Sequence, residues 1–306
     1  MFWIIILILA AALLVLCYIC AYSCFNVRST GEDVPFVPKG EQYEPLREEI
    51  LANINAGAEL PYEDVYIQSF DGLRLHGKFY AVKEGAPTHI LVHGYRSSAL
   101  LDFGGGLASV VKRGHNALLI DQRGHSGSEG KYLSFGINES RDVLGWVDYI
   151  NQRLGADKPV ILEGVSMGAA TVLMTIELGL PENVIGILAD SPYSSPEEAI
   201  RYVMKRDGFP QFLFPLLRLG GRIFCGFDIS SRSPRESVKK CTVPVFFIHG
   251  DEDLYVPYEM GVETYEACPA KKFFFTGKGA GHVLSFLIDN EGYREIHSQF
   301  MAEILK

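Results

Sequence analysis

An uninterrupted run of residues without a charged side chain opens the chain, from Phe2 to Val27. A membrane core needs about 20 apolar residues, each rising about 1.5 Å along a helix, so this run is long enough to cross one. We therefore predict a transmembrane anchor over residues 1–27. A cleaved signal peptide is one alternative, although no Lys or Arg precedes the run and the run is longer than a signal sequence. Lipoprotein processing at Cys24 is another, although the bulky Tyr22 fits such a site poorly.

The residues after the run predict a linker and then one folded domain. Residues 28–59 are rich in Pro, Gly and charge, which is typical of a tether, with a short helix near its end. Residues 60–306 predict the folded domain. Arg28, Lys39 and Arg47 follow the run closely, whereas only the α-amino group precedes it. Because positive charge beside a span stays inside the cell, this pattern favours a cytoplasmic domain at the cell membrane over an extracellular one.

The domain shows two kinds of strand pattern. Polar and apolar residues alternate over 65–70 and 73–81, as in half-buried antiparallel strands. Later runs are continuously apolar, which is typical of parallel strands covered by helices on both faces. These runs are 89–94, 117–121, 159–164, 184–190, 244–250 and 271–277. With helical periodicity between them, as at 137–155, the pattern predicts a doubly wound α/β fold around a mostly parallel eight-stranded sheet.

A long insertion at about 191–240 interrupts the alternation of strands and helices. Residues 201–240 hold nine basic and three acidic side chains, a local charge of +6, and residues 209–224 are apolar at helix-like spacing. We predict a small helical cap from this segment. Two interpretations of its apolar face stay open: it packs on the ends of the strands, or it also faces anionic lipid.

The composition excludes several classes of protein. Of 306 residues, 48% are hydrophobic and 21% are charged, which is typical of a folded protein and not of a disordered one. The formal net charge of −9 argues against a nucleic-acid partner. We expect no nucleotide cofactor, because no G-x-G-x-x-G or P-loop motif occurs. We also expect no metal, because His89 and His93 lack further acidic ligands, and we expect His93 to be structural.

The clearest candidate for chemistry is a G-x-S-x-G motif formed by Gly164, Val165, Ser166, Met167 and Gly168. It follows a predicted strand and opens a helical run, the context that marks a nucleophile on a sharp turn. In so tight a turn, a Cβ at either glycine would collide with the strand or the helix. We therefore predict that Ser166 is a nucleophile whose hydroxyl projects above the C-terminal edge of the sheet.

A serine hydroxyl needs a base that a carboxylate holds in the right tautomer, and in such folds the chain order is nucleophile, acid, base. His282, in a glycine-rich loop after the last predicted strand, is the predicted base, whereas His297 lies in a terminal amphipathic helix. Asp253 is the predicted acid, because it follows a strand at a distance that lets a carboxylate reach a histidine. Asp251, which more often caps the turn, and Asp190, which ends another strand, are the alternatives.

Two backbone N–H groups are predicted to bind the negatively charged oxygen that such a reaction creates. One belongs to Met167, next to the nucleophile. The other belongs to Tyr95, in the loop after the first parallel strand, where Gly94 permits a close approach. Arg123 and His125 are expected to stabilise another loop at the sheet edge.

Seven motifs occur in the order LVHGYRSS, DQRGHSGSEG, FGINESRDVLGWVDYI, GVSMG, ADSPYSS, HGDEDLYVP and GAGH. Over about residues 45–306 the chain resembles the α/β-hydrolase superfamily, and more narrowly its bacterial membrane-anchored branch of the serine aminopeptidase S33 or Hydrolase-4 type. The resemblance implies an α/β-hydrolase fold and carries catalytic roles onto Ser166, Asp253 and His282, the positions reached above. Members with a similar N-terminal hydrophobic helix support the predicted anchor, although this chain lacks their usual basic N-terminal flank.

These features predict a serine hydrolase that cleaves a carboxylic ester through an acyl-enzyme intermediate, with a small-molecule or lipid-like acyl substrate. The resemblance suggests an aminopeptidase or amidase as the alternative, in which Glu197 and Glu198 near the base of the cap would hold the substrate ammonium. The apolar cap favours the esterase. An alternative of another class is a non-catalytic envelope scaffold, which would typically have lost one member of the triad. The sequence indicates no particular protein partner.

Overall fold

The structure of the protein is a computed structural model that describes residues 1–27 and 40–306. The predicted tether over 28–59 therefore lies partly outside the described residues. Its described part forms a short 3₁₀ turn, η1 (Glu44–Leu46), and helix α2 (Arg47–Ala58). The domain boundaries expected from the sequence stay predictions.

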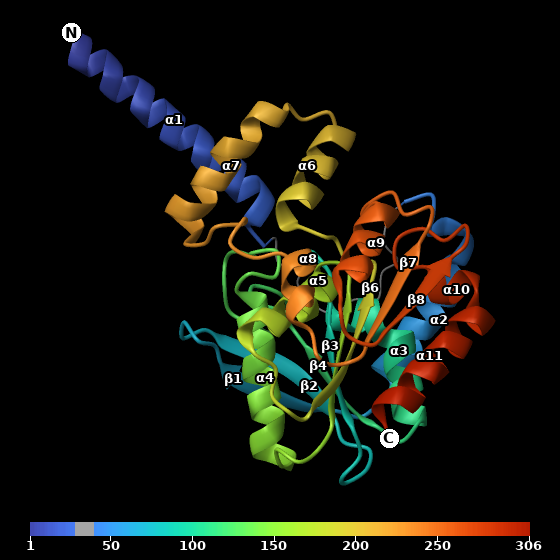
Figure 1. The fold of residues 1–306 in the computed structure, drawn as a ribbon. Helices are drawn as coiled ribbons and strands as arrows, with labels where there is room; N and C mark the ends of the chain where they lie inside the picture. The colour runs from blue at the N-terminus through green and yellow to red at the C-terminus, as the bar shows by residue number, and fades with distance from the viewer. Residues whose placement is uncertain (28–39) are drawn as a thin grey trace.

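An eight-stranded sheet forms the centre of the domain (Figure 1). The strands lie in the order β1-β2-β4-β3-β5-β6-β7-β8; β2 is antiparallel to β1 and β4, and the other neighbours are parallel. They are β1 (Glu63–Gln68), β2 (Arg74–Tyr80), β3 (Thr88–Val92), β4 (Asn116–Ile120), β5 (Val160–Val165), β6 (Val184–Asp190), β7 (Val245–Gly250) and β8 (Lys272–Gly277). Every predicted strand is present, so the predicted doubly wound α/β fold is confirmed.

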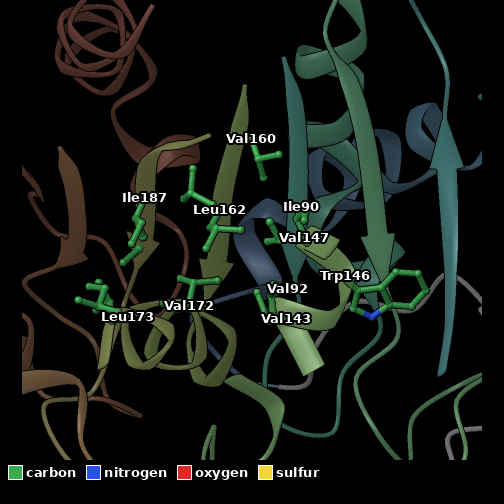
Figure 2. Close-up of a cluster of buried hydrophobic side chains, with 14 of the residues drawn as sticks. Ile90, Val92, Val143, Trp146, Val147, Val160, Leu162, Val172, Leu173 and Ile187 are labelled. Carbon is green, nitrogen blue, oxygen red and sulfur yellow. The ribbon is translucent and has the colours of Figure 1, made fainter. Parts of the chain in front are cut away.

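Helices cover both faces of the sheet. Successive side chains of a strand point to opposite faces, so the apolar strands have side chains to bury on both. The covering helices are α3 (Ala99–Lys112), α4 (Glu139–Leu154), α5 (Met167–Thr175) with η2 (Ile176–Leu178), α9 (Tyr258–Ala267), α10 (Ser285–Ile288) and α11 (Asn290–Ile304). On β3, Ile90 and Val92 pack with α4 and α5, whereas Leu91 packs with α3. Figure 2 shows the first of these clusters, where Trp146 of α4 is fully buried. Full burial of each large apolar side chain contributes roughly 1.5–3 kcal/mol.

Helix α2 packs directly against α3. A Cβ added at Gly57 would lie 2.7 Å from the backbone of Gly104, and one added at Gly104 would lie 2.5 Å from the Cα of Ile54. Two glycines therefore let the helices approach backbone to backbone. This contact holds the segment just before α2, residues 40–46, near the C-terminal edge of the sheet, where it contacts the loop after β8.

The insertion between β6 and β7 is helical, as expected. It contains α6 (Pro196–Arg206), η3 (Gln211–Leu213), α7 (Phe214–Gly220), a π-helical turn η4 (Gly221–Cys225), α8 (Pro234–Ser237) and η5 (Val238–Lys240). We call the part formed by α6, η3, α7 and η4 the cap. Buried apolar side chains of the cap, among them Met204 and Leu217, form a cluster of their own.

The apolar N-terminal helix α1 (Phe2–Phe25) completes that cluster. Figure 1 shows its N-terminal part projecting away from the domain, while its last turns lie beside α7. Ala21 and Phe25 are fully buried against the cap, and a Cβ at Gly220 would lie only 2.2 Å from the carbonyl oxygen of Cys17. The cap therefore packs largely on the end of α1, an arrangement that the sequence patterns did not predict.

Candidate active site

The G-x-S-x-G motif forms a strained turn between β5 and α5. Ser166 has φ 54° and ψ −119°, a region that residues with a side chain rarely occupy. A Cβ at Gly164 would lie 2.3 Å from the carbonyl of Gly168, and one at Gly168 would lie 1.9 Å from the carbonyl oxygen of Val92. The expected steric need for both glycines is confirmed. Ser166 is half-buried, whereas its two neighbours in the chain are buried.

His282 and Asp253 lie in hydrogen-bond contact on the loops after β8 and β7. His282 Nδ1 donates to Asp253 Oδ2 at 2.6 Å. The other carboxylate oxygen accepts the backbone N–H groups of Tyr255 at 2.8 Å and Val256 at 2.9 Å. His249 Nε2 lies 3.3 Å from the same Oδ2 that accepts from His282. These contacts satisfy the fully buried carboxylate and fix the orientation and tautomer of the His282 ring.

The two side chains shift each other's titration. Burial alone would raise the pKa of Asp253, but the charge of His282 and the hydrogen bonds from His249 and His282 lower it well below its usual range. Burial works against protonation of His282, but the Asp253 carboxylate outweighs it and raises the pKa of His282 above 6.5. The arrangement therefore favours an ionised carboxylate beside an imidazole that is more basic than usual.

The loops that carry Ser166 and His282 are both bonded to the end of β6. The N–H of Ser166 donates to the carbonyl oxygen of Asp190 at 2.8 Å, and the N–H of Val283 donates to Ser191 Oγ at 3.3 Å. Ser166 and His282 therefore belong to one edge of the sheet, where the parallel strands end. Among the described residues, the Ser166 hydroxyl makes no hydrogen bond to His282; such contacts often form only when substrate binds.

The alternatives considered for the acid and the base have other partners. Asp251 accepts a hydrogen bond from the Gly279 N–H at 2.7 Å and so caps the turn between the two loops. Asp190 is buried and accepts a hydrogen bond from the hydroxyl of Ser191, and burial raises the pKa of Asp190 to about 6. His297 lies on α11, where Arg113 Nη1 approaches its ring at 3.3 Å and burial lowers its pKa to about 4.

The loop after β3 lies against the nucleophile turn. A Cβ at Gly94 would lie 3.3 Å from the Cβ of Ser166, so the predicted close approach of this loop is present. The carboxylate of Asp102 accepts the Gly94 N–H at 2.6 Å and the Ser97 hydroxyl at 2.6 Å, which holds the loop in place. Met167 is the first residue of α5, where backbone N–H groups and the helix dipole favour negative charge. The N–H groups of Met167 and Tyr95 stay predicted oxyanion donors.

Several side chains that support this site were not predicted from the sequence. Gln42 Oε1 accepts the His282 N–H at 3.2 Å, and the Tyr43 hydroxyl donates to the His282 carbonyl at 3.4 Å. Asp102 and His249, described above, hold the loop after β3 and the acid. Only the three-dimensional fold reveals these contacts, because Gln42 lies 240 residues before His282 in a segment without a motif.

The remaining candidates have structural roles. His93 Nδ1 donates to the Gly94 carbonyl at 2.8 Å and its Nε2 accepts the Gln122 N–H at 3.0 Å, as expected of a structural histidine. Burial lowers its pKa to about 3. His89, four positions earlier, instead contacts Glu163 and His115, so the two histidines have separate partners.

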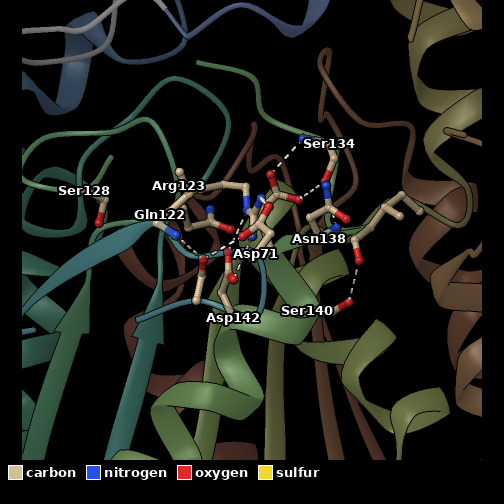
Figure 3. A network of polar contacts seen from close by, with 12 residues as sticks. Asp71, Gln122, Arg123, Ser128, Ser134, Asn138, Ser140 and Asp142 are labelled. Carbon is tan, nitrogen blue, oxygen red and sulfur yellow. Dashed lines mark hydrogen bonds and ion pairs between the residues drawn. The ribbon is translucent and has the colours of Figure 1, made fainter. Parts of the chain in front are cut away.

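Arg123 is the centre of a buried polar network (Figure 3). Its guanidinium donates to Asp142 at 2.7 and 2.8 Å and to Asp71 at 2.9 and 3.2 Å. His125 Nδ1 donates to the Arg123 carbonyl oxygen at 3.1 Å. The expectation that Arg123 and His125 stabilise a loop at the sheet edge is confirmed.

Comparison with known proteins decides the family. A family model described as "Alpha/beta hydrolase family" matches residues 90–295, about two thirds of the chain. The chain belongs to the alpha/beta hydrolase family. The resemblance of its motifs to this superfamily is thereby confirmed.

Several relatives of this alpha/beta hydrolase are known by sequence or structure. The protein YqkD of Bacillus subtilis is 25% identical over 239 residues, which cover 77% of each chain. A protein of Danio rerio named lysophosphatidylserine lipase ABHD12 is 26% identical over 197 residues, 59% of this chain and 46% of its own length. Among solved structures, the Pyrococcus furiosus esterase Pf2001 superimposes with a TM-score of 0.65 at 23% identity, covering 89% of this chain and 98% of its own. This structural likeness shows the fold alone.

Proposed function

We propose that this alpha/beta hydrolase is a membrane-anchored serine hydrolase that cleaves carboxylic esters with Ser166, His282 and Asp253. The observation that carries the proposal is the 2.6 Å hydrogen bond between His282 and Asp253 at the sheet edge that also bears the strained Ser166 turn. An imidazole held by a buried carboxylate and a hydroxyl on a sharp turn are what acyl transfer requires.

In the first half of the reaction, His282 Nε2 takes the proton of the Ser166 hydroxyl while Ser166 Oγ attacks the ester carbonyl carbon. The carbonyl electrons move onto the oxygen, and the N–H groups of Met167 and Tyr95 stabilise that oxyanion. When the tetrahedral intermediate collapses, the bond to the alcohol oxygen breaks and His282 returns the proton to the leaving alcohol. An acyl group remains on Ser166 Oγ.

In the second half, His282 takes a proton from a water molecule, which attacks the acyl carbonyl carbon. Collapse of the second intermediate releases the carboxylic acid and restores the Ser166 hydroxyl with the proton from His282. Throughout, Asp253 keeps the Nδ1 proton in place and stabilises the imidazolium.

Contacts at the base of the cap favour an ester over a peptide with a free amino terminus. An aminopeptidase would need a free carboxylate to bind the substrate ammonium. Glu197 already pairs with Arg201 at 3.0 Å and accepts the Ser230 hydroxyl at 2.8 Å, and Glu198 pairs with Arg235 at 3.1 Å. The name of the lipase among the similar proteins also supports an ester substrate.

Helix α1 supports retention of the N-terminal segment as an anchor. Phe2–Phe25 is long and apolar enough to cross a membrane, and its N-terminal part is exposed. A signal sequence that is removed has no need to pack on the mature domain, yet removal of α1 would uncover the cap residues that bury Ala21 and Phe25. We propose a single-pass anchor with a cytoplasmic domain, as Arg28, Lys39 and Arg47 favour.

The test uses the full chain in detergent with p-nitrophenyl esters of graded chain length. We expect Ser166→Ala to lower kcat by about 10⁶-fold, as loss of the nucleophile does in other serine hydrolases. A fluorophosphonate probe is expected to label the unchanged chain and Ser298→Ala, a change on the exposed face of α11, but not Ser166→Ala. Turnover of aminoacyl anilides without esters would favour the amidase, and no labelling at Ser166 would favour the scaffold.

A further inference from the structure

Three large apolar side chains of the cap are exposed next to helix α1. Leu219 of α7 is 40% exposed, and Ile223 and Phe224 of η4 are 50% and 37% exposed. We call these three residues the cap rim. Exposed apolar groups that adjoin one another in this way mark a surface that meets another apolar phase.

The cap rim lies level with residues 17–18 of α1. Phe224 packs edge-on against Tyr18, with 5.3 Å between the ring centroids. Gly220, next to Leu219, contacts the backbone of Cys17 so closely that a Cβ there would lie 2.2 Å from its carbonyl oxygen. A bilayer that covers α1 at Tyr18 therefore also covers the cap rim.

The length of α1 requires the bilayer to reach this level. From Trp3 to Tyr18 the helix rises about 22 Å, at about 1.5 Å per residue, whereas a hydrocarbon core is about 30 Å thick. From Trp3 to Tyr22 it rises about 28 Å, so Trp3 and Tyr22 match the two interfaces where aromatic side chains gather. With Tyr22 at the interface, Tyr18 and the cap rim lie about 6 Å deeper, inside the hydrocarbon.

The charge beside the cap rim fits the headgroup region. A cavity of about 170 Å³ is lined by Arg201, Arg218 and Arg222 together with Leu219. Arg218 and Arg222 pair with the single carboxylate of Asp228, and Arg201 pairs with that of Glu197, so one positive charge is left over. Arginines at a membrane surface extend toward lipid phosphates while their stems stay among apolar groups.

We propose that the cap rim inserts into an anionic lipid bilayer beside α1, with the arginine side chains that line the cavity extending toward the phosphates. This proposal rests on the proposed anchor and adds a second, independent point of membrane contact. The end of α1 is also bonded to the loop after β3: the Tyr95 hydroxyl donates to the Cys24 carbonyl at 2.9 Å, and Arg96 donates to the carbonyls of Ser23 and Asn26 at 2.9 Å. The candidate active site then lies at the membrane surface, where amphiphilic esters are concentrated.

Tryptophan quenching in vesicles tests the insertion. The full chain with Trp3→Phe and Ile223→Trp is placed in vesicles of phosphatidylcholine and phosphatidylglycerol that carry brominated acyl chains. The matched control has Trp3→Phe and Leu305→Trp, because Leu305 is similarly exposed and is next to the C-terminus, which lies away from α1 (Figure 1). Trp146 is fully buried in the core and gives the same background in every variant.

We expect the bromines to remove most of the emission from position 223 and none from position 305. Quenching of Trp3 in the unchanged chain, without quenching at position 223, would keep the anchor and overturn the insertion of the cap rim. If Trp3 itself is not quenched, the anchor is wrong and the proposal about the rim is wrong with it. Fluorophosphonate labelling of Ser166 in each variant reports on folding.

Discussion

The ring of Phe25, in the last turn of α1, packs edge-on against the ring of Phe227, just after the cap, with 4.9 Å between their centroids. The same helix therefore has two parts with different surroundings. Its first turns expose apolar side chains such as Phe2, whereas its last turns belong to the apolar core of the cap. Position along one helix decides which mutations affect folding.

We expect Phe25→Ala to destabilise the domain by about 3–5 kcal/mol, because it leaves a cavity in a buried cluster. Phe2→Ala in the exposed turns is the control and should leave the unfolding temperature unchanged. Thermal unfolding of both full-length variants in detergent measures the difference. Equal unfolding temperatures would mean that α1 does not pack on the cap.

The activity should depend on pH through His282. The base must be neutral to accept the Ser166 proton, and the Asp253 carboxylate raises the pKa of His282 above 6.5. Activity is therefore lost as the pH falls through that raised pKa, and we expect the acid limb of kcat/KM to lie above pH 6.5.

The variant Asp253→Asn separates the two roles of the carboxylate. Loss of its charge should move the acid limb to lower pH, and loss of the correct tautomer should lower kcat by about 10⁴-fold. Asp251→Asn is the matched control, because Asp251 bonds Gly279 and Lys278 and should leave the limb in place. If Asp251→Asn moves the acid limb and Asp253→Asn does not, then Asp251 is the acid and the assignment of Asp253 is wrong.

Much of the fold was predictable because the central strands are buried on both faces. Continuous apolar runs such as VFFI of β7 are typical of a strand in a parallel sheet that helices cover on both faces. The candidate nucleophile was predictable for a similar reason, since Gly164 and Gly168 are needed by the local backbone geometry alone. Local constraints of this kind are visible in a short stretch of sequence.

The contacts that cross the fold were not predictable. Helix α1 is apolar on every side, so no pattern indicates which of its side chains, such as Ala21 and Phe25, meet the cap. Gln42 supports the site by accepting the N–H of His282, which lies 240 residues away, and Asp102 supports it by accepting the N–H of Gly94 and the hydroxyl of Ser97. A polar residue in a loop carries no sign of such a partner until the loops are placed in space.

The buried pair of Arg123 and Asp142 should matter more for stability than an exposed pair. Burial raises the pKa of Asp142 to about 6 even with the Arg123 guanidinium beside it. Removal of the guanidinium therefore leaves a buried carboxyl group without its positively charged partner. We expect Arg123→Met to destabilise the domain by about 3–5 kcal/mol. Arg47→Met, which removes an exposed pair with Glu44, should have no measurable effect in the same urea titration. Similar effects of both changes would contradict the burial argument.

The turn at Ser166 should tolerate no side chain at Gly168. A Cβ there would lie 1.9 Å from the Val92 carbonyl oxygen, so Gly168→Ala must displace the helix or the strand and should abolish fluorophosphonate labelling. Gly106→Ala is the control, because its nearest neighbour would be Phe103 at 3.7 Å and Ala suits a helix interior better by about 0.5–1 kcal/mol. Full labelling of Gly168→Ala would show that the turn is looser than the structure has it.

Membrane orientation can be read from reporters fused to the C-terminus, which lies at the surface away from α1 (Figure 1). Arg28, Lys39 and Arg47 follow the proposed anchor, so their positive charges should hold the domain in the cytoplasm. We expect a green fluorescent protein fusion to fluoresce in bacterial cells and an alkaline phosphatase fusion to be inactive. Changing the three basic residues to Gln and adding lysines before Phe2 should reverse both results. An active phosphatase on the unchanged chain would place the domain outside, while leaving the chemistry at Ser166 untouched.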